Sequence, residues 1–313
     1  INITKRTKAS FSHWVGKWGR NLLNPYSPEV NISKLVDPIE IEAVWIKRHL
    51  ITLSSRYGEP RGGGWYTESS TALISIEKEI VFKNGTKVVF ESWSGDLEDE
   101  RNNLTIRVDG PYSLIATWRR YFLINLKFLD SRDRSIEPTT VKIVDEKGVA
   151  HTLTDYENIW LEEGEYRLSL VEYKTTDVKP TIPVILRVNR PTTLSVKCRV
   201  YYLTIEVVDL LGFPVSGIKA SVTLPDGTVI TSSGDREVLL EQLPVGVYDV
   251  QVTGFLYDRV HRVDVHGDRE ITITVPLSAT SLAILLGLGL SIGGGIYFLS
   301  RFFRRKCCCL KWK

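Results

Sequence analysis

The stretch VDGPYSLIATWRRYFLINL (108–126) decides the fold, because it repeats the earlier stretch VDPIEIEAVWIKRHLITL (36–53). Six residues of the earlier stretch recur 73 positions later, among them Ala43 as Ala116 and Trp45 as Trp118. In both stretches apolar and polar side chains alternate, which is the pattern of β-strands with one buried face. The sequence therefore predicts a repeated β module and an all-β protein.

One complete copy of this module is predicted over residues 47–119 and a partial copy over 1–46. The first half of the partial copy would precede residue 1, so we expect the chain to belong to a longer polypeptide. A second matching block has an offset of 79 rather than 73, which places an insertion in the loop around residues 20–28. In this block Thr7, Lys8, Phe11, Trp14 and Gly16 recur as Thr86, Lys87, Phe90, Trp93 and Gly95.

Glycines and aromatic residues stand at fixed places in these copies: Tyr57-Gly58, Gly63-Gly64-Trp65-Tyr66, Phe90-x-x-Trp93-x-Gly95-Asp96 and Pro111…Ala116-x-Trp118. At these residues the chain resembles the divergent internalin-type B-repeats of bacterial and archaeal surface proteins, over residues 5–120. The resemblance implies small β modules with a structural or adhesive role and with no catalytic residues to carry over.

Two copies of a longer module follow, in which YFLINLKFLD (121–130) parallels YYLTIEVVDL (201–210) at a distance of 80 residues. Alternating segments separated by hairpin turns, such as the one at 225–227, predict two β-sandwiches. They are expected over 120–200 and 201–277.

The second of these copies carries Asp209…Gly212-x-Pro214-Val215-x-Gly217, then Pro225-Asp226-Gly227, then an LPxGxY turn over 243–248. At these residues it resembles a carboxypeptidase regulatory-like, prealbumin-type β-sandwich. The first copy is diverged, since it has Glu162-Glu163 where Pro244-Val245 stand in the second. Such sandwiches occur as accessory domains on many unrelated proteins, so the resemblance implies a fold and no activity.

An uncharged run of 22 residues, ATSLAILLGLGLSIGGGIYFLS, occupies 279–300. As a helix it would span about 33 Å, close to the roughly 30 Å of a membrane's hydrocarbon core. The alternative is a buried soluble helix, for which the strand-rich remainder offers no helical partner. We therefore expect a single transmembrane helix over 279–300 that contacts membrane lipid.

The bases of RFFRRK (301–306) favour a cytoplasmic tail over 301–313 by the positive-inside rule. The predicted localisation is the cell membrane, with a single pass, the N-terminus outside and the C-terminus in the cytoplasm. Within the span Gly289 and Gly293 form a GxxxG pair, whose small side chains suit transmembrane packing and self-association.

Charge is distributed unevenly along the chain. The formal net charge is +3, but six of the 40 Lys and Arg residues follow residue 278, where no acidic residue occurs. Residues 1–278 thus hold 34 bases against 37 acids and carry a net charge of about −3. We therefore expect no nucleic-acid partner, because the bulk of the chain has no excess of basic residues.

Only Cys198 of the four cysteines lies in the predicted exterior, where it has no disulfide partner. We expect it to be a small buried hydrophobe in a strand. For the consecutive Cys307, Cys308 and Cys309, lipidation, metal binding and no specific role stay open, although adjacent cysteines fit one tetrahedral ion poorly.

Candidate ligand contacts are Trp65 and Tyr66, which follow an exposed-looking glycine turn and offer flat apolar faces with polar ends. Core packing is the alternative, and it is favoured for these aromatic residues as a whole, most clearly for the repeat-defining Trp93 and Trp118. No catalytic, cofactor-binding or metal-binding motif is recognised in the sequence. Four sequons predict N-glycosylation, at Asn2, Asn31, Asn84 and Asn103.

The combined interpretation is a non-enzymatic, membrane-anchored stalk or adhesion protein of a prokaryotic, and in the first place archaeal, cell surface. A surface glycan or another protein is the expected partner. The alternative is that these modules are the accessory and anchoring region of a larger surface enzyme, a protease or glycosidase, whose catalytic domain lies upstream.

Overall fold

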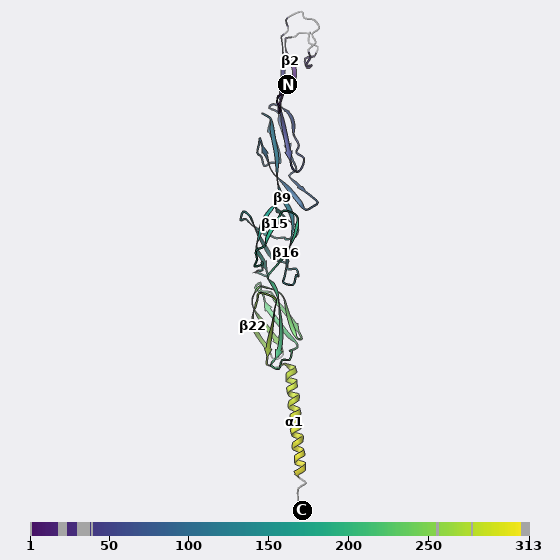
Figure 1. Cartoon of the computed structure of the whole chain (residues 1–313), viewed down its shortest axis with the longest axis vertical. Coiled ribbons are helices and arrows are strands. Elements are labelled where there is room, and N and C mark those ends of the chain that lie inside the picture. The colour runs from purple at the N-terminus through teal and green to yellow at the C-terminus, as the bar shows by residue number, and fades with distance from the viewer. Residues whose placement is uncertain are drawn as a thin grey trace, which may run out of the picture. The chain divides into compact units, whose positions relative to one another are not determined.

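The computed structural model describes residues 2–17, 24–29, 38, 40–254, 257–276 and 278–307. Over these residues it is built from β-strands and one C-terminal helix, which confirms the predicted all-β class (Figure 1). The chain divides into two compact units. The first consists of residues 1–123 with 160–163 and 188–192, and the second of 124–159 with 164–187 and 193–313.

The first unit is organised around a mixed sheet with the strand order β1-β2-β3-β9-β7-β6, and β4 pairs with β3. Strands β3 and β9 are parallel, and the other pairs are antiparallel. Strands β5 and β8 form a separate antiparallel ribbon. The bounds are β1 (Asn2–Thr4), β2 (Thr7–Lys17), β3 (Glu40–Ser55), β4 (Gly64–Thr67), β5 (Thr71–Ser75), β6 (Glu79–Val81), β7 (Thr86–Gly95), β8 (Asn103–Arg107), β9 (Tyr112–Leu129) and β12 (Ile159–Glu162).

The core of this unit lies between the sheet and the β5–β8 ribbon. Trp93 on β7 and Leu114 on β9 are fully buried on the sheet side. Ile74 on β5 and Ile106 on β8 face them from the ribbon, and their neighbours in each strand are exposed or half-buried. Successive residues of a strand point to opposite faces, so this alternation follows from the period of two in the sequence.

The two copies of the sequence repeat share one strand register. Phe11 lies opposite Trp45 between β2 and β3, and Phe90 lies opposite Trp118 between β7 and β9. In each pair of strands a register shift follows directly after the phenylalanine. The repeated residues therefore occupy equivalent places in two similar strand pairs, bulge included.

The repeated glycine at the end of β2 and of β7 is required by its backbone. Gly95 has a φ of +115°, and a Cβ atom built on it would lie 2.3 Å from the carbonyl oxygen of Ser113. Gly16 has a φ of +140°, and its Cβ would lie 2.1 Å from the carbonyl oxygen of Glu40. Only glycine fits both the backbone conformation and the space beside the neighbouring strand.

In the second unit a first sandwich includes a sheet of order β11-β10-β13-β14, with β15 paired to β13, and β16 pairs with β9. Phe128, Val141, Ile143 and Val171 are buried in it. The bounds are β10 (Thr140–Asp145), β11 (Ala150–Leu153), β13 (Gly164–Tyr173), β14 (Thr176–Asp177), β15 (Ile185–Val188) and β16 (Thr192–Lys197).

A second sandwich has the sheets β20-β17-β23 and β19-β18-β21-β22. Inward side chains of both sheets, such as Leu203, Leu240 and Val250, form one buried core. The first strand β17 and the last strand β23 are parallel neighbours. The bounds are β17 (Val200–Asp209), β18 (Ile218–Thr223), β19 (Val229–Gly234), β20 (Glu237–Pro244), β21 (Gly246–Gly254), β22 (Tyr257–Val265) and β23 (Arg269–Val275).

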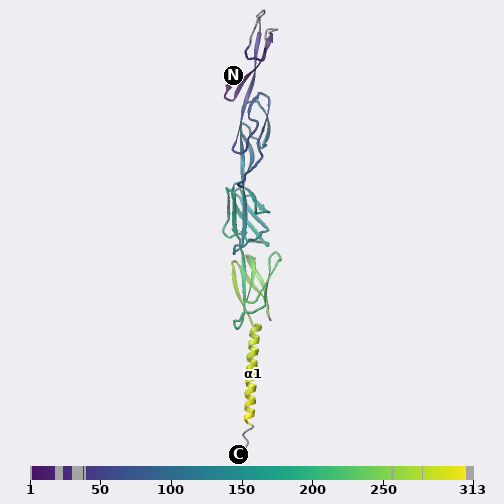
Figure 2. The ribbon, with the colours of Figure 1, turned by 90° about the vertical axis from the view of Figure 1, so that its right-hand side faces the viewer.

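Helix α1 (Ala279–Cys307) contains the uncharged run for which a membrane span was predicted (Figure 1, Figure 2). Among the described residues, no helix is long and apolar enough to cross a membrane. The predictions of a transmembrane helix over 279–300 and of a single-pass cell-membrane localisation are therefore wrong. The described side chains of the segment include Thr280, Ser281, Ser291 and Ser300, and its glycines have no apolar side chain to contribute.

We predict that Gly95→Ala lowers the free energy of local unfolding of its module by about 2 kcal/mol or more, because alanine fits neither the backbone conformation nor the space beside Ser113. Hydrogen exchange of the amides of β7 and β9 measures this change. Gly110→Ala is the control, since a Cβ at that glycine meets no atom within 4 Å. Equal protection of the two variants would contradict the steric argument.

Candidate functional site

The predicted ligand contacts Trp65 and Tyr66 are neighbours in β4 and point to opposite faces of the strand. Trp65 is 37% exposed, and the Lys8 ammonium lies 4.2 Å from its ring centroid. Tyr66 packs against the core, and its hydroxyl donates to the Gly62 carbonyl at 2.9 Å. The two rings therefore do not form one platform, and a ligand contact at Trp65 stays a prediction.

Of the four predicted glycosylation sites, Asn84 and Asn103 are exposed in the structure. The Asn84 carboxamide oxygen accepts the Thr86 N–H at 3.0 Å, and Asn103 begins β8. The Asn2 side chain and Asn31 lie outside the described residues. N-glycosylation stays a prediction for all four.

The cysteine and glycine predictions have different outcomes. Cys198 is buried as expected, and its burial raises the pKa of the thiol to about 12, so the thiol stays protonated at neutral pH. Gly289 and Gly293 are helical, but their surroundings lie outside the described residues. Cys308 and Cys309 also lie outside them.

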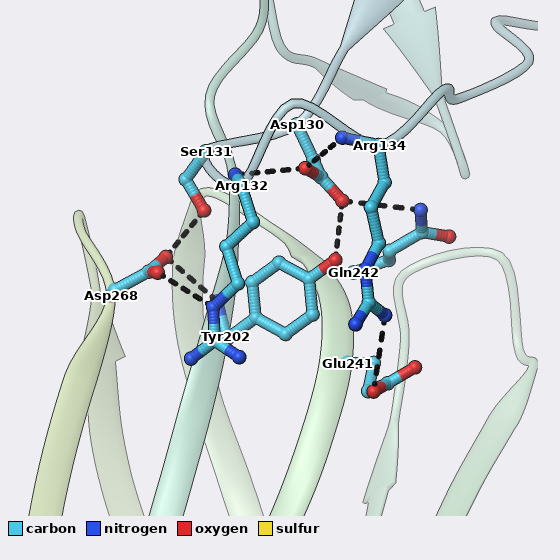
Figure 3. Close-up of polar contacts among 8 residues, drawn as sticks. All are labelled: Asp130, Ser131, Arg132, Arg134, Tyr202, Glu241, Gln242 and Asp268. Carbon is cyan, nitrogen blue, oxygen red and sulfur yellow. Dashed lines mark hydrogen bonds and ion pairs between the residues drawn. The ribbon is translucent and has the colours of Figure 1, made fainter.

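A buried carboxylate that the sequence did not single out is the centre of a polar site in the second unit (Figure 3). Asp130 directly follows β9 and is completely buried. Its Oδ1 accepts the N–H groups of Arg132 and Arg134, both at 2.9 Å. Its Oδ2 accepts the Tyr202 hydroxyl at 2.5 Å and the Gln242 amide at 3.2 Å. We call these residues, with the charged rim described next, the Asp130 cluster.

Charged side chains surround this centre (Figure 3). The Arg132 guanidinium lies 4.0 Å from the Tyr202 ring centroid and pairs with Asp268 at 3.1 Å. Arg134 pairs with Glu241 at 3.3 Å. These ion pairs are solvent-accessible and are each worth about 0–1 kcal/mol. The buried hydrogen bonds to Asp130 therefore contribute most of the stabilisation.

A short local motif positions Asp130. Its own N–H donates to the Arg134 carbonyl, and the Asp133 N–H donates back to the Asp130 carbonyl, with Asp133 at a φ of +63°. Together with the two bonds to Oδ1, these contacts close a tight loop that leaves Oδ2 free for side chains from β17 and β20. An aspartate accepting backbone N–H groups two and four residues on is a local turn device.

The same loop recurs at Asp209, at the end of β17. Its Oδ1 accepts the N–H groups of Leu211 and Phe213 at 2.9 and 3.0 Å, and Gly212 has the positive φ, at +80°. Its Oδ2 accepts the hydroxyls of Ser278, at 2.6 Å, and Ser281, at the start of α1. Each of these two aspartates thus closes its own loop with one oxygen and binds side chains from later in the chain with the other.

Hydrogen bonding keeps both carboxylates ionised. Burial alone would raise the pKa of Asp130, but the bonds from Tyr202, Arg134, Gln242 and Arg132 hold that pKa below its usual range. The pKa of Asp209 is likewise lowered, because the bonds from the two serines and the loop N–H groups outweigh burial.

The pKa of the Tyr202 phenol is shifted in the opposite direction. Burial, and next the hydrogen bond to Asp130, raise the pKa of Tyr202 to about 12. At neutral pH the carboxylate is therefore charged and the phenol is protonated. General acid–base catalysis needs a pKa near the working pH, so this arrangement is suited to holding segments together and not to transferring protons.

The segments that contain Asp130 and Asp209 are predicted repeat partners, but at an offset of 80, which places Leu129 against Asp209. An offset of 79 aligns the two aspartates. The signal available in the sequence is Asp-x-x-Gly or Asp-x-x-Asp directly after a strand, and it also occurs at Asp145, where Gly148 has a φ of +82°.

No protein-family model matches the chain, and no curated protein matches it. The resemblances to internalin-type repeats and to carboxypeptidase regulatory-like sandwiches therefore stay predictions. Similar solved structures include the Bacillus anthracis TIE protein (TM-score 0.30, 11% identity, covering 76% of this chain and 54% of that one). Others are a streptococcal ancillary pilin (0.26, 13%, 75% and 81%) and the major pilin subunit of Bacillus cereus (0.23, 8%, 72% and 97%). The chain spans about half the length of the TIE protein chain.

We predict that Tyr202→Phe lowers the free energy of unfolding of the second unit by about 2 kcal/mol at pH 7, because Asp130 loses a hydrogen bond to a charged group. The pKa of Asp130 is lowered on folding, so its stabilisation is present above the unfolded pKa of about 3.9 and is lost as pH falls further. The difference between wild type and variant should therefore shrink below about pH 4 in urea unfolding at several pH values.

Tyr201→Phe is the matched control, because it removes the same hydroxyl one residue away, outside the Asp130 cluster. It should change stability by much less at every pH. A difference for Tyr202→Phe that is independent of pH would show that Asp130 is not the group involved.

We further predict that Asp209→Asn weakens the attachment of the first turn of α1, because an amide has one accepting oxygen where the carboxylate uses two, and so cannot accept both the loop N–H groups and the serine hydroxyls. Amides of residues 281–284 should exchange faster with solvent, while those of the core strand β21 keep their protection. Unchanged exchange at the helix start would contradict the role assigned to Asp209.

Proposed function

We propose that this chain is a non-enzymatic adhesive or spacer protein of the cell surface, whose β modules carry tensile load along the chain. The observation that supports the proposal is the parallel pairing of the first strand of a module with its last strand. In the second sandwich, β17 and β23 pair over seven residue pairs, from Leu203 with Arg269 to Asp209 with Val275.

This topology determines how the module responds to tension. The chain enters at the start of β17 and leaves at the end of β23, which lie at opposite ends of the parallel pair. Tension between these ends pulls the two strands past each other. The evenly spaced ladder bonds between them are then strained together and not one after another. A pair loaded in this way resists force better than one that is peeled open.

The same arrangement occurs in the first unit. Strands β3 and β9 are parallel over five residue pairs, from Ile51 with Tyr112 to Ser55 with Ala116. The Asp130 and Asp209 contacts complement these pairs, since each bonds the end of one element to the start of another with a buried charged acceptor. The carboxylates of Asp130 and Asp209, whose pKa values are lowered, accept hydrogen bonds that hold the fold together. This favours a structural role over a catalytic one.

We predict that the chain resists extension from its ends with a rupture force several times that of a peeling geometry. Single-molecule force spectroscopy on the full chain, with Cys307, Cys308 and Cys309 replaced by serine, measures this force, because rupture under load is governed by the unfolding rate.

The control uses handles at Val247→Cys and Asp264→Cys, which are register partners at the open end of the β21–β22 hairpin. Pulling there separates one residue pair at a time, so the force should be much lower. Equal forces in the two geometries would overturn the load-bearing proposal.

A further inference from the structure

A groove of about 880 Å³ lies in the first sandwich of the second unit. It is lined by residues 126–129 of β9, by residues of the 133–137 loop after Asp130, and by residues 154–159, which lead into β12. All of these residues belong to the second unit. The volume is within the range of ligand-binding pockets, roughly 300–1,000 Å³. We call it the β9 groove.

The two sandwiches differ at the strand beside this groove. The LPxGxY turn of the second sandwich has its counterpart 82 positions earlier, so the counterpart of Glu237, the first residue of β20, is Asp155. Strand β12, however, begins only at Ile159, and residues 155–158 form no strand. The edge of β9 is therefore left without a strand at residues whose counterparts in β17 pair with β20.

Two backbone groups of β9 point toward this open edge. The Leu126 N–H donates to the Tyr156 carbonyl at 2.7 Å. The Phe128 carbonyl accepts the Ile136 N–H at 2.9 Å. Residues i and i+2 of a strand direct their backbone groups to the same edge, so the Leu126 carbonyl and the Phe128 N–H lie between these two bonds. In the described chain neither group has a backbone partner at this edge, and such a pair of groups is what an added extended peptide bonds to.

The β9 groove carries an excess of negative charge. Its acidic lining residues come from both loops, and they are Asp133, Glu137, Asp155 and Glu157. Asp133 pairs with Lys197 at 3.0 Å. Within the described ranges the other three form no ion pair, and the one basic lining residue is Lys127. A ligand with positive charges therefore complements the groove.

The Tyr156 ring lies among these carboxylates. It is half-buried and packs edge to face on Phe128, with the centroids 5.4 Å apart at 89°. Burial raises the pKa of the Tyr156 phenol, and the charges of Glu137 and Glu157 raise it further. The two carboxylates come from different loops and act on one phenol. Two carboxylates beside an aromatic ring attract an ammonium or guanidinium group through their charge and through the ring's electrons.

We propose that the β9 groove binds an extended peptide segment of a partner protein, with lysine or arginine at alternate positions. The peptide backbone bonds to the Leu126 carbonyl and the Phe128 N–H, which adds a short strand to the sheet. Its cationic side chains project to one face and pair with Glu137 and Glu157. In strand addition the main-chain bonds give affinity and the side chains give selectivity. The groove supplies a partner for the adhesive role proposed above, and it is tested by binding alone, so its failure leaves the force measurements unaffected.

The test titrates the synthetic peptide acetyl-Thr-Lys-Thr-Lys-Thr-amide into the full chain with isotope-labelled phenylalanines. The amide resonance of Phe128 should shift and saturate, because its N–H gains an acceptor, while that of Phe90 in the first unit should not move. Glu137→Gln combined with Glu157→Gln should weaken binding by about tenfold, since two solvent-accessible ion pairs are lost. Both glutamates are exposed, so the double variant keeps the fold. Glu270→Gln is the control, because it removes an exposed carboxylate of the same unit outside the groove and should leave affinity unchanged.

Two altered peptides separate the backbone contribution from the charge contribution. A peptide N-methylated at every residue keeps both charges but cannot donate to the Leu126 carbonyl, and it should not bind. A peptide with glutamate in place of both lysines keeps the backbone and should not bind either. The proposal is overturned if the unaltered peptide leaves the Phe128 amide unshifted or if the double variant binds it equally well. Equal binding of the N-methylated peptide would also overturn it, because the contact would then be electrostatic only.

Discussion

The structure depends first on the pairing between the first and last strands of its modules. When these strands are parallel neighbours, the end of the first lies beside the end of the last, and therefore beside the start of the element that follows. Ser55 accepts the Trp118 indole N–H at 2.9 Å in this way. Asp209 and Ser278 meet for the same reason. A polar residue at the end of a module's first strand can therefore form a hydrogen bond with the element that follows the module.

Asp130 and Asp209 show why a carboxylate suits this place. A buried charge is costly unless it is fully hydrogen-bonded. Each aspartate uses two loop N–H groups for one oxygen and two side-chain donors from elements later in the chain for the other. If the side-chain donors moved away, a buried charge would be left without part of its hydrogen bonds. Separating the elements therefore costs more free energy than losing a neutral contact would. The same bonding keeps the groups ionised and unsuited to proton transfer.

The aromatic residues of the two repeat copies separate local from tertiary effects. Phe11 with Trp45 and Phe90 with Trp118 have closely similar ring geometries, because both follow from the same register and the same bulge. Their burial differs, because Phe90 and Trp93 share a core with the β5–β8 ribbon, whereas Trp45 is 46% exposed. A core residue and a surface residue can therefore have the same sequence signature, and the tryptophan spacing alone does not distinguish them.

The sequence by itself determined the all-β class and the repeat, since a period of two and a recurring spacing can be read along the chain. That glycine is required at Gly16 and Gly95 depends on the carbonyl oxygens of the neighbouring strands. The lack of charge over 279–300 predicted a membrane span there, which the described structure contradicts. Only the tertiary structure decided that Asp130 meets Tyr202 and Gln242, which follow it by 72 and 112 residues. Strand order brings these side chains together, and strand order is set by the packing of whole sheets, which no local pattern encodes.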